Sequence, residues 1–176
     1  MPLPLKIALV CVVLVAGVYD LRSRRIPNWV SLSGIVLGAG GNTLLFGWHG
    51  LREAGFGLLC AVAIYMPLYL VRAMGAGDVK LMAAVGAIVG PQDWLQIFLA
   101  TAIIGGILSL AVVASKHRLA QTLQNVGVIA RELLHLRAPS RADSRFDVRH
   151  GDSMRLPHGA AIASGCMVYL LFSASR

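Results

Sequence analysis

Long apolar runs separated by short polar turns make up most of this 176-residue chain. Membrane-spanning helices need about 20 predominantly apolar residues, and five of the runs approach or reach that length. A sixth run is short for a full crossing at a helical rise of about 1.5 Å per residue, so we expect it to be tilted or extended. The six runs are residues 3–19, 29–46, 54–71, 81–89 (the short one), 95–114 and 157–173. The pattern predicts an all-α fold, a polytopic membrane protein with about six transmembrane helices.

One polar stretch, residues 116–156, interrupts this pattern. Its first half places apolar residues at helical spacing with Arg and His residues opposite, which predicts an amphipathic helix on the membrane surface. Its second half is a charged loop without a period. We expect residues 1–176 to form a single membrane-embedded domain that includes this segment. A solvated linker whose basic helix binds anionic lipids is the simplest interpretation of the segment.

Composition supports a membrane protein. The chain is 57% hydrophobic and 14% charged, whereas soluble globular domains carry about 25% charged residues. The net charge of +8 could indicate a nucleic-acid partner. The Lys and Arg residues, however, lie at the ends of apolar runs and in the polar segment, so we expect no nucleic-acid binding.

The positions of these basic residues predict the topology. Thirteen Lys and Arg residues lie in the first, third and fifth loops, and three (Lys6, Arg52 and Arg176) lie on the other side. Cytoplasmic loops carry the excess of positive charge in membrane proteins. We therefore expect both termini to lie outside the cytoplasm. Asp20 and Asp78, at the ends of their apolar runs, should lie at the cytoplasmic surface of the membrane.

The three cysteines, Cys11, Cys60 and Cys166, each lie inside an apolar run, and no pair has CxxC spacing. Their placement favours buried cysteines that pack as small hydrophobic residues over a disulfide framework or a zinc site. No other set of residues predicts a metal site, and we expect the protein to need no cofactor.

Two of the eight acidic residues stand out, because Asp20 and Asp78 each adjoin an apolar run on the same side of the membrane. An ionisable group at this depth is costly and marks a functional site. Structural roles are open for each residue taken singly. Asp20 could anchor the first helix at the interface with Arg22 and Arg24 as partners, and Asp78 could be the N-cap of the fourth helix.

Taken together, the two aspartates suggest a specific chemistry. If their carboxyl groups approach within a few ångströms, the pair shares one proton. One group can then activate a water molecule while the other protonates the carbonyl oxygen or leaving amine of a peptide. The glycines before Asp78 allow a backbone or substrate to approach closely. These residues predict a membrane-embedded aspartic endopeptidase.

Three segments carry a family resemblance: YDLRSRRIPNWVSL, MGAGDVKLMAAVG and LPHGAAIASG. Their order and spacing resemble those of type IV prepilin leader peptidases, which are GxGD membrane aspartic peptidases. The resemblance implies that Asp20 and Asp78 are catalytic, that Gly75 and Gly77 shape the active-site turn, and that Lys80 contacts substrate or lipid. It also implies a prepilin-like substrate with a hydrophobic helix, cleaved after its basic leader at the cytoplasmic face of the bacterial inner membrane.

The chain departs from this family in two ways. It lacks the N-terminal insert with paired CxxC motifs that the long form carries, so we do not expect methyltransferase activity. It is similar to the short form that processes Flp-type (tight-adherence) pilins. The polar segment 116–156 is the second departure, and the resemblance implies no role for it.

Two other functions stay open at this point. Presenilin-like and signal-peptide-peptidase-like intramembrane proteases share the Tyr-Asp and GxGD pairing, although the IPN loop and the small size favour a leader peptidase. A small proton-coupled transporter component could also use two aspartates, although no paired repeats appear. His158 could face the active site, but the simpler interpretation is that it starts the last helix and faces solvent, because a single histidine has no partner there.

Overall fold

The computed structural model describes residues 1–70, 74–115 and 158–174, and this part of the chain contains helices and no strand. The all-α prediction is therefore confirmed. The predicted amphipathic helix and loop of residues 116–156 lie outside the described residues. The helices are α1 (Leu3–Ser23), α2 (Asn28–Leu70), α3 (Ala76–Val89), α4 (Pro91–Ser115) and α7 (His158–Ala174).

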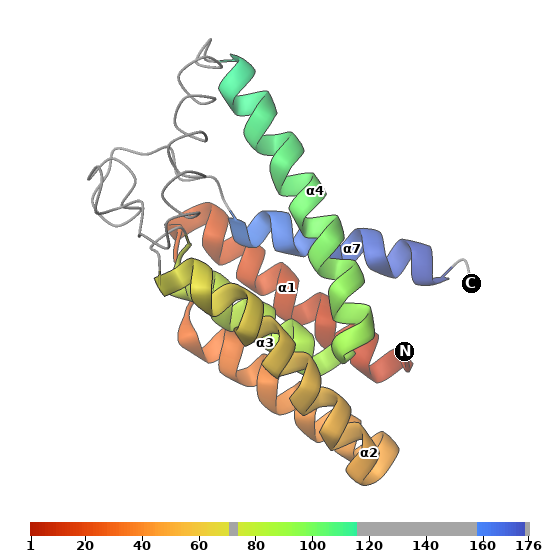
Figure 1. Cartoon of the computed structure of the whole chain (residues 1–176). Helices are drawn as coiled ribbons and strands as arrows, with labels where there is room; N and C mark the ends of the chain where they lie inside the picture. The colour runs from red at the N-terminus through yellow and green to blue at the C-terminus, as the bar shows by residue number, and fades with distance from the viewer. Residues whose placement is uncertain (71–73, 116–157, 175–176) are drawn as a thin grey trace.

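Helix α2 is a hairpin of two helical arms. Its backbone departs from helical geometry at Gly47, which has φ 62° and ψ −142°, a conformation that glycine adopts without the penalty of a side chain. The chain reverses there, and Figure 1 shows both arms running from the hairpin turn back towards the same end of the bundle. The predicted apolar runs 29–46 and 54–71 left a polar turn between them, but residues 48–53 are helical and belong to the second arm. The turn is tighter than predicted because a single glycine makes the break.

Helix α3 packs closely against both arms of α2. A Cβ atom on Gly38 of the first arm would lie 2.6 Å from the backbone carbon of Ala87, and Gly57 of the second arm meets the backbone of Gly86. Residues 81–88 of α3 are all buried. These glycines let the helix backbones approach closely, as in many membrane helix pairs. This packing explains how α3 can be short, because the two arms of α2 cover it on both sides.

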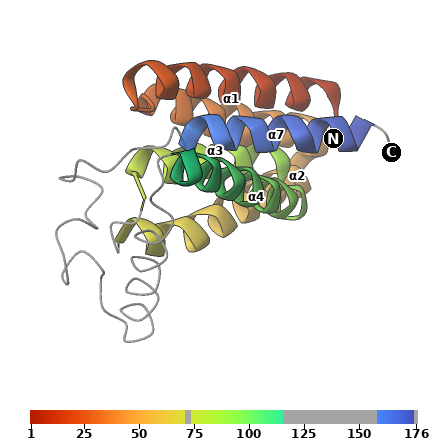
Figure 2. The ribbon, with the colours of Figure 1, turned by 90° about the horizontal axis from the view of Figure 1, so that it is seen from above.

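Helices α1, α4 and α7 complete the bundle, with α7 packed against both α1 and α4. The start of α4 is held by Trp94, whose indole Nε1 donates a hydrogen bond to the carbonyl oxygen of Met82 at 3.2 Å. Figure 2 shows that α1 ends where α7 begins. The C-terminal end of α1 and the N-terminal ends of α3 and α7 therefore meet at one end of the bundle (Figures 1 and 2).

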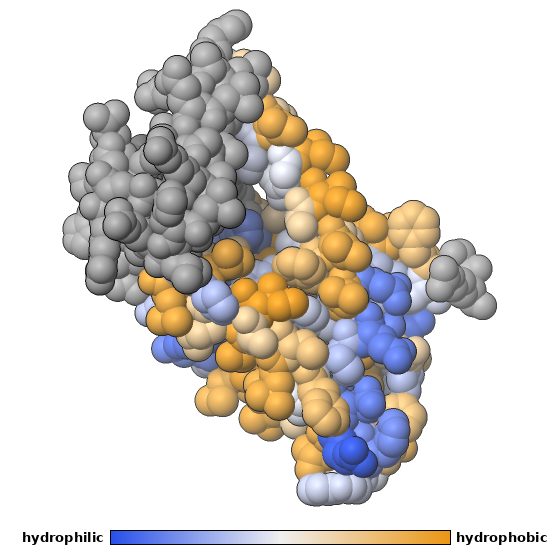
Figure 3. Space-filling view, viewed as in Figure 1, coloured by the Kyte–Doolittle hydropathy of each residue, from blue (hydrophilic) through white to orange (hydrophobic). Residues whose placement is uncertain are grey.

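The outer surface of the bundle is strongly apolar. Leu44 is 89% exposed and Leu171 is 73% exposed, and apolar side chains cover much of the face in Figure 3, with polar side chains gathered near the hairpin turn of α2. Within the described residues, three helices are long and apolar enough to cross a membrane, and α7 adds a shorter apolar helix. The chain is a membrane protein, and six crossings stay a prediction.

Candidate active site

Asp20 is held by the end of another helix. It lies in the last turns of α1, is only 7% exposed, and accepts a hydrogen bond at 2.8 Å from the backbone N–H of Gly159 to its Oδ2 atom. Gly159 is the second residue of α7, where the N–H groups have no partner within their own helix and carry partial positive charge. The start of α7 therefore fixes the position of the Asp20 carboxyl group.

Asp78 lies in the first turn of α3, three residues after the N-cap residue Gly75. The backbone N–H of Gly75 donates a hydrogen bond to the Asp78 carboxyl group, which is the reciprocal half of a capping box. One structural interpretation of the sequence made Asp78 the N-cap of this helix. The N-cap is Gly75 instead. The contact orients its side chain back over the start of its own helix.

The structure brings the two aspartates together. Asp20 and Asp78 come from different helices and lie close enough for their charges to interact. No hydrogen bond joins the two carboxyl groups, both of which belong to the described residues.

Glycines keep side-chain atoms away from both aspartates. A Cβ atom on Gly159 would lie 3.0 Å from both the Cβ and the Oδ2 atoms of Asp20, and one on Gly75 would lie 3.4 Å from an Asp78 carboxyl oxygen. A Cβ atom on Gly77 would lie 3.3 Å from the Cβ atom of Ile26. Gly77 thus allows the loop between α1 and α2 to pack against the start of α3.

Lys80 lies two residues after Asp78 and faces the start of α2. Its ammonium Nζ donates a hydrogen bond at 2.9 Å to Oδ1 of Asn28, on the surface of the bundle. The resemblance assigned Lys80 to substrate or lipid, and those contacts stay a prediction. The geometry gives Lys80 a further role, which is to tie the N-terminal part of α3 to the first residue of α2.

His158 was the residue that the sequence analysis judged wrongly. It begins α7 as expected, but its side chain is half-buried and interacts electrostatically with Asp78. The sequence allowed His158 to face the site but named no partner for it. The pairing depends on how α7 docks against α1 and α3, which the sequence pattern does not specify.

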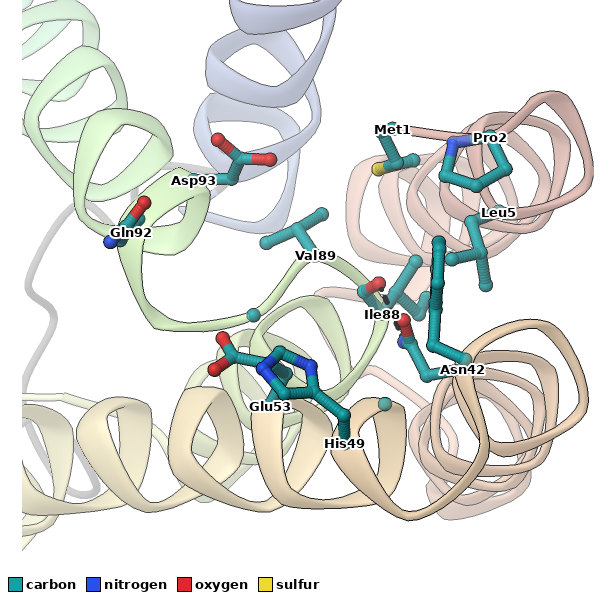
Figure 4. A pocket seen from close by; sticks show the side chains of 13 residues that line it. Met1, Pro2, Leu5, Asn42, His49, Glu53, Ile88, Val89, Gln92 and Asp93 are labelled. Atoms are coloured by element: carbon teal, nitrogen blue, oxygen red, sulfur yellow. Dashed lines mark hydrogen bonds between the residues drawn. The ribbon is translucent and has the colours of Figure 1, made fainter.

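A cavity of about 520 Å³ lies at the other end of the bundle. Figure 4 shows its lining, which comes from the start of α1, the hairpin turn of α2, the end of α3 and the start of α4. Polar side chains there include His49, Glu53 and Asp93. Neither Asp20 nor Asp78 lines this cavity, so it is separate from the candidate active site.

The fold and the site define a polytopic helical membrane protein with two carboxyl groups meeting at one end of its bundle. A model of the type IV leader peptidase family matches residues 7–110, which is more than half of the chain. The chain belongs to this family, as the sequence resemblance predicted, and is a type IV leader peptidase-like protease.

The matched range contains both Asp20 and Asp78 and ends before α7. His158 and Gly159, which face the aspartates, therefore lie outside it. Searches of curated proteins and of solved structures gave no match. The catalytic roles of Asp20, Asp78, Gly75, Gly77 and Lys80 stay predictions.

Proposed function

We propose that this protein is an aspartic endopeptidase that removes a short basic leader from prepilin-like precursors. The observation that carries the proposal is the meeting of Asp20 and Asp78 at one end of the bundle, in a chain of the type IV leader peptidase family. Two neighbouring carboxyl groups share a proton because both cannot stay ionised at short range. This gives one general base and one general acid at the same site.

In this mechanism the attacking water and the scissile peptide bind between the two carboxyl groups. The ionised carboxylate takes a proton from the water as the water attacks the carbonyl carbon, and the protonated carboxyl group donates to the carbonyl oxygen or leaving amine. The Gly159 N–H keeps Asp20 in place, and the Gly75 N–H keeps Asp78 in place. Both hydrogen-bond donors are backbone N–H groups. Each donor is therefore held in place by a helix and does not depend on the conformation of a side chain.

The substrate would approach with its apolar helix in the bilayer and its basic leader at the cytoplasmic surface of the inner membrane. The proposal places the aspartates at this surface because thirteen of the sixteen Lys and Arg residues belong to the same side. Cleavage at the margin avoids unwinding a helix in the apolar core, where each unsatisfied backbone group costs several kcal/mol. Both termini would then lie outside the cytoplasm.

We further propose that the substrates are Flp-type prepilins and that the enzyme does not methylate the new N-terminus. No CxxC pair is present among the three cysteines of the sequence. The basic segment 116–156 would bind anionic lipids.

The test is leader cleavage by Asp20→Asn and Asp78→Asn variants. The variants are expressed with a precursor that has a short basic leader and an apolar helix, and processing is followed by gel shift. Each variant should lose at least about a hundredfold in cleavage rate, because each removes one acid–base group. Glu53→Gln, in the cavity at the far end, is the matched control and should cleave normally.

Full processing by either asparagine variant would remove the carboxyl pair from the mechanism. Cleavage inside the apolar helix, rather than after the leader, would instead indicate a protease of the presenilin type.

A further inference from the structure

The cavity at the end of the bundle opposite the two aspartates combines apolar walls with hydrogen-bond acceptors. Its volume of about 520 Å³ falls in the range of small-ligand sites, about 300–1,000 Å³. Figure 4 shows the acceptors on three different segments: Asn42 on the first arm of α2, Glu53 on the second arm and Asp93 at the start of α4. The apolar side chains of the lining include Leu5, Phe46, Ile88 and Val89.

Asn42 presents an acceptor that has no donor. The residue is only 7% exposed, and its Nδ2 atom donates to the carbonyl oxygens of Gly38, Ala87 and Ile88 at 2.9, 3.2 and 3.0 Å. These three carbonyl groups fix the orientation of the amide, because an oxygen in the place of Nδ2 could not bond to any of them. No described residue donates a hydrogen bond to the Oδ1 atom.

The Oδ1 atom of Asn42 is also accessible from the cavity. Within the described residues, the fully enclosed polar side-chain atoms that lack a partner are Ser31 Oγ and Thr101 Oγ1. The Asn42 Oδ1 atom is not one of these enclosed atoms, and Asn42 lines the cavity. An occupant of the cavity can therefore donate a hydrogen bond to it.

Two half-buried carboxyl groups give the same lining negative charge. The Glu53 carboxyl group lies against the end of α3, where a Cβ atom on Gly90 would be 3.5 Å from its Oε2 atom. Asp93 lies in the first turn of α4. Among the described residues of the lining there is one α-amino group, that of Met1, and no Lys or Arg side chain. Negative charge therefore exceeds positive charge, which favours a cationic occupant.

A bare metal ion does not fit this lining. Among the residues that the structure describes, no three His, Cys, Asp or Glu side chains are grouped closely enough to hold one, and the apolar walls supply no ligand. An ammonium group on an apolar body fits both parts of the lining, because an ammonium donates three hydrogen bonds and accepts none.

The position of the cavity indicates where such a group comes from. The lining belongs to the start of α1, the hairpin turn of α2, the end of α3 and the start of α4, and the ends of membrane-spanning helices lie at the level of the lipid head groups. Trp48, next to the hairpin turn, is 73% exposed, and tryptophans are enriched at this level of membrane proteins. An aminophospholipid presents a primary ammonium group at the same depth.

We propose that the cavity binds a primary ammonium group on an apolar body, and that its occupant in the membrane is the ethanolamine head group of a phospholipid. The ammonium donates to Asn42 Oδ1 and to the carboxylates of Glu53 and Asp93. Leu5 and Ile88 contact the methylene groups, and the acyl chains follow the apolar outer surface of the bundle. This site is independent of the proposed peptidase function.

The first test uses the wild-type protein alone. Delipidated protein in detergent is titrated with phosphatidylethanolamine, phosphatidylcholine and phosphatidylglycerol of the same acyl chains, and bound lipid is measured by native mass spectrometry. Phosphatidylethanolamine should bind about tenfold more tightly than the other two, because the choline head group has no N–H to donate and the glycerol head group has no cation. Equal binding of the ethanolamine and choline lipids would overturn the proposal, as would a preference for phosphatidylglycerol.

The second test locates the site. The double variant Glu53→Gln/Asp93→Asn keeps the shape of both side chains and should bind the ethanolamine and choline lipids within about twofold of each other. Asp20→Asn, the same type of change at the other end of the bundle, should keep the wild-type preference. An unchanged preference in a folded double variant would show that the head group binds elsewhere. If the double variant does not fold, Asp93→Asn alone is compared in the same way, and its preference should fall about threefold or more.

Soluble amines distinguish a lipid from a free ligand. Ethanolamine should displace the bound lipid from the wild type, and choline should not, because the N–H groups carry the recognition. Equal displacement by both amines would contradict a site for a primary ammonium group. Binding of free ethanolamine without a preference among the three lipids would overturn the phospholipid as the occupant.

Discussion

Asp20 and Asp78 are positioned by backbone donors from different parts of the chain. The donor to Asp20 lies at the start of α7, whereas the donor to Asp78 lies at the start of its own helix. Asp78 is thus oriented by local structure, and Asp20 by the docking of a separate helix. Changes at the start of α7 should therefore disturb Asp20 more than Asp78.

Gly159→Ala tests this contact. The added methyl group would lie 3.0 Å from Asp20, so the carboxyl group or α7 must move. We expect cleavage to fall on the order of ten- to a hundredfold, since a displacement of about 1 Å can cost a hundredfold in rate. The control is Gly106→Ala in α4, where a Cβ atom meets nothing within 4 Å.

Alanine is the better helix former, so lower activity in Gly159→Ala cannot come from weaker helix propensity. A wild-type rate would show that the close approach of Gly159 to Asp20 is unnecessary for catalysis.

The bond between Lys80 and Asn28 gives a second prediction at this scale. Lys80→Met and Asn28→Ala each remove the hydrogen bond and should lower cleavage by about two- to tenfold, the range of one net hydrogen bond. Because one interaction is lost in both cases, the double variant should be no slower than the single ones. Additive losses would instead support a separate contact of Lys80 with substrate or lipid.

Individual residues were predictable where their placement carries an energetic cost. Asp20 and Asp78 are acidic groups at the margins of apolar runs, so the sequence alone suggested that they act together. Their donors were not predictable, because a backbone N–H has no sequence signature. His158 was missed for the same reason, since its neighbour is set by the docking of α7.

Among the helices, α3 is the one whose position depends most clearly on backbone contact. Gly57 and Gly86 face each other at the crossing of α2 and α3, and Gly38 lies against Ala87 on the other side. Asn42 adds hydrogen bonds from its Nδ2 atom to the carbonyl oxygens of Ala87 and Ile88 at 3.2 and 3.0 Å. The end of α3 opposite Asp78 is thereby anchored to α2.

Gly57→Ala should destabilise the protein, because its methyl group would overlap the backbone carbonyl of Gly86. We expect the free energy of unfolding to fall by about 1–3 kcal/mol, the usual cost of overpacking, measured by denaturation in detergent. Gly55→Ala on the same arm is the control, because a Cβ atom there meets nothing within 4 Å. Equal stability of the two variants would contradict the close crossing.

The sequence predicted which segments are helical but not where they break. Apolar runs 29–46 and 54–71 correspond to the two arms of α2, and the reversal occurs at Gly47. Several glycines surround this region, and only the tertiary contacts determine which one adopts a positive φ. The sequence did not explain why the run 81–89 is too short for a full crossing, because the helices that pack against it were unknown.

At the scale of the whole molecule, the helix ends that carry the two aspartates share one end of the bundle. The end of α1 and the starts of α3 and α7 lie together, and the first turn of α1 lies at the opposite end (Figure 2). The structure contains no membrane, so the side that faces the cytoplasm stays a prediction from the Lys and Arg positions.

Single cysteines introduced into a cysteine-free protein test the orientation. A membrane-impermeant maleimide applied to intact cells should label position 49, in the hairpin turn of α2, and should label position 24 only after permeabilisation. Position 144, outside the described residues, should behave like position 24. Labelling of position 24 from outside would put the carboxyl pair on the wrong face for a leader peptidase.

The hydrogen bond between Gly159 and Asp20 joins residues 139 positions apart in the chain. This separation has a consequence for biosynthesis, because α1 leaves the ribosome long before α7 exists. During most of translation Asp20 lacks its donor and Asp78 lacks His158. The proposed catalytic centre would therefore assemble only after α7 has been inserted, and until then a nascent chain would be unable to cut newly made membrane proteins beside it.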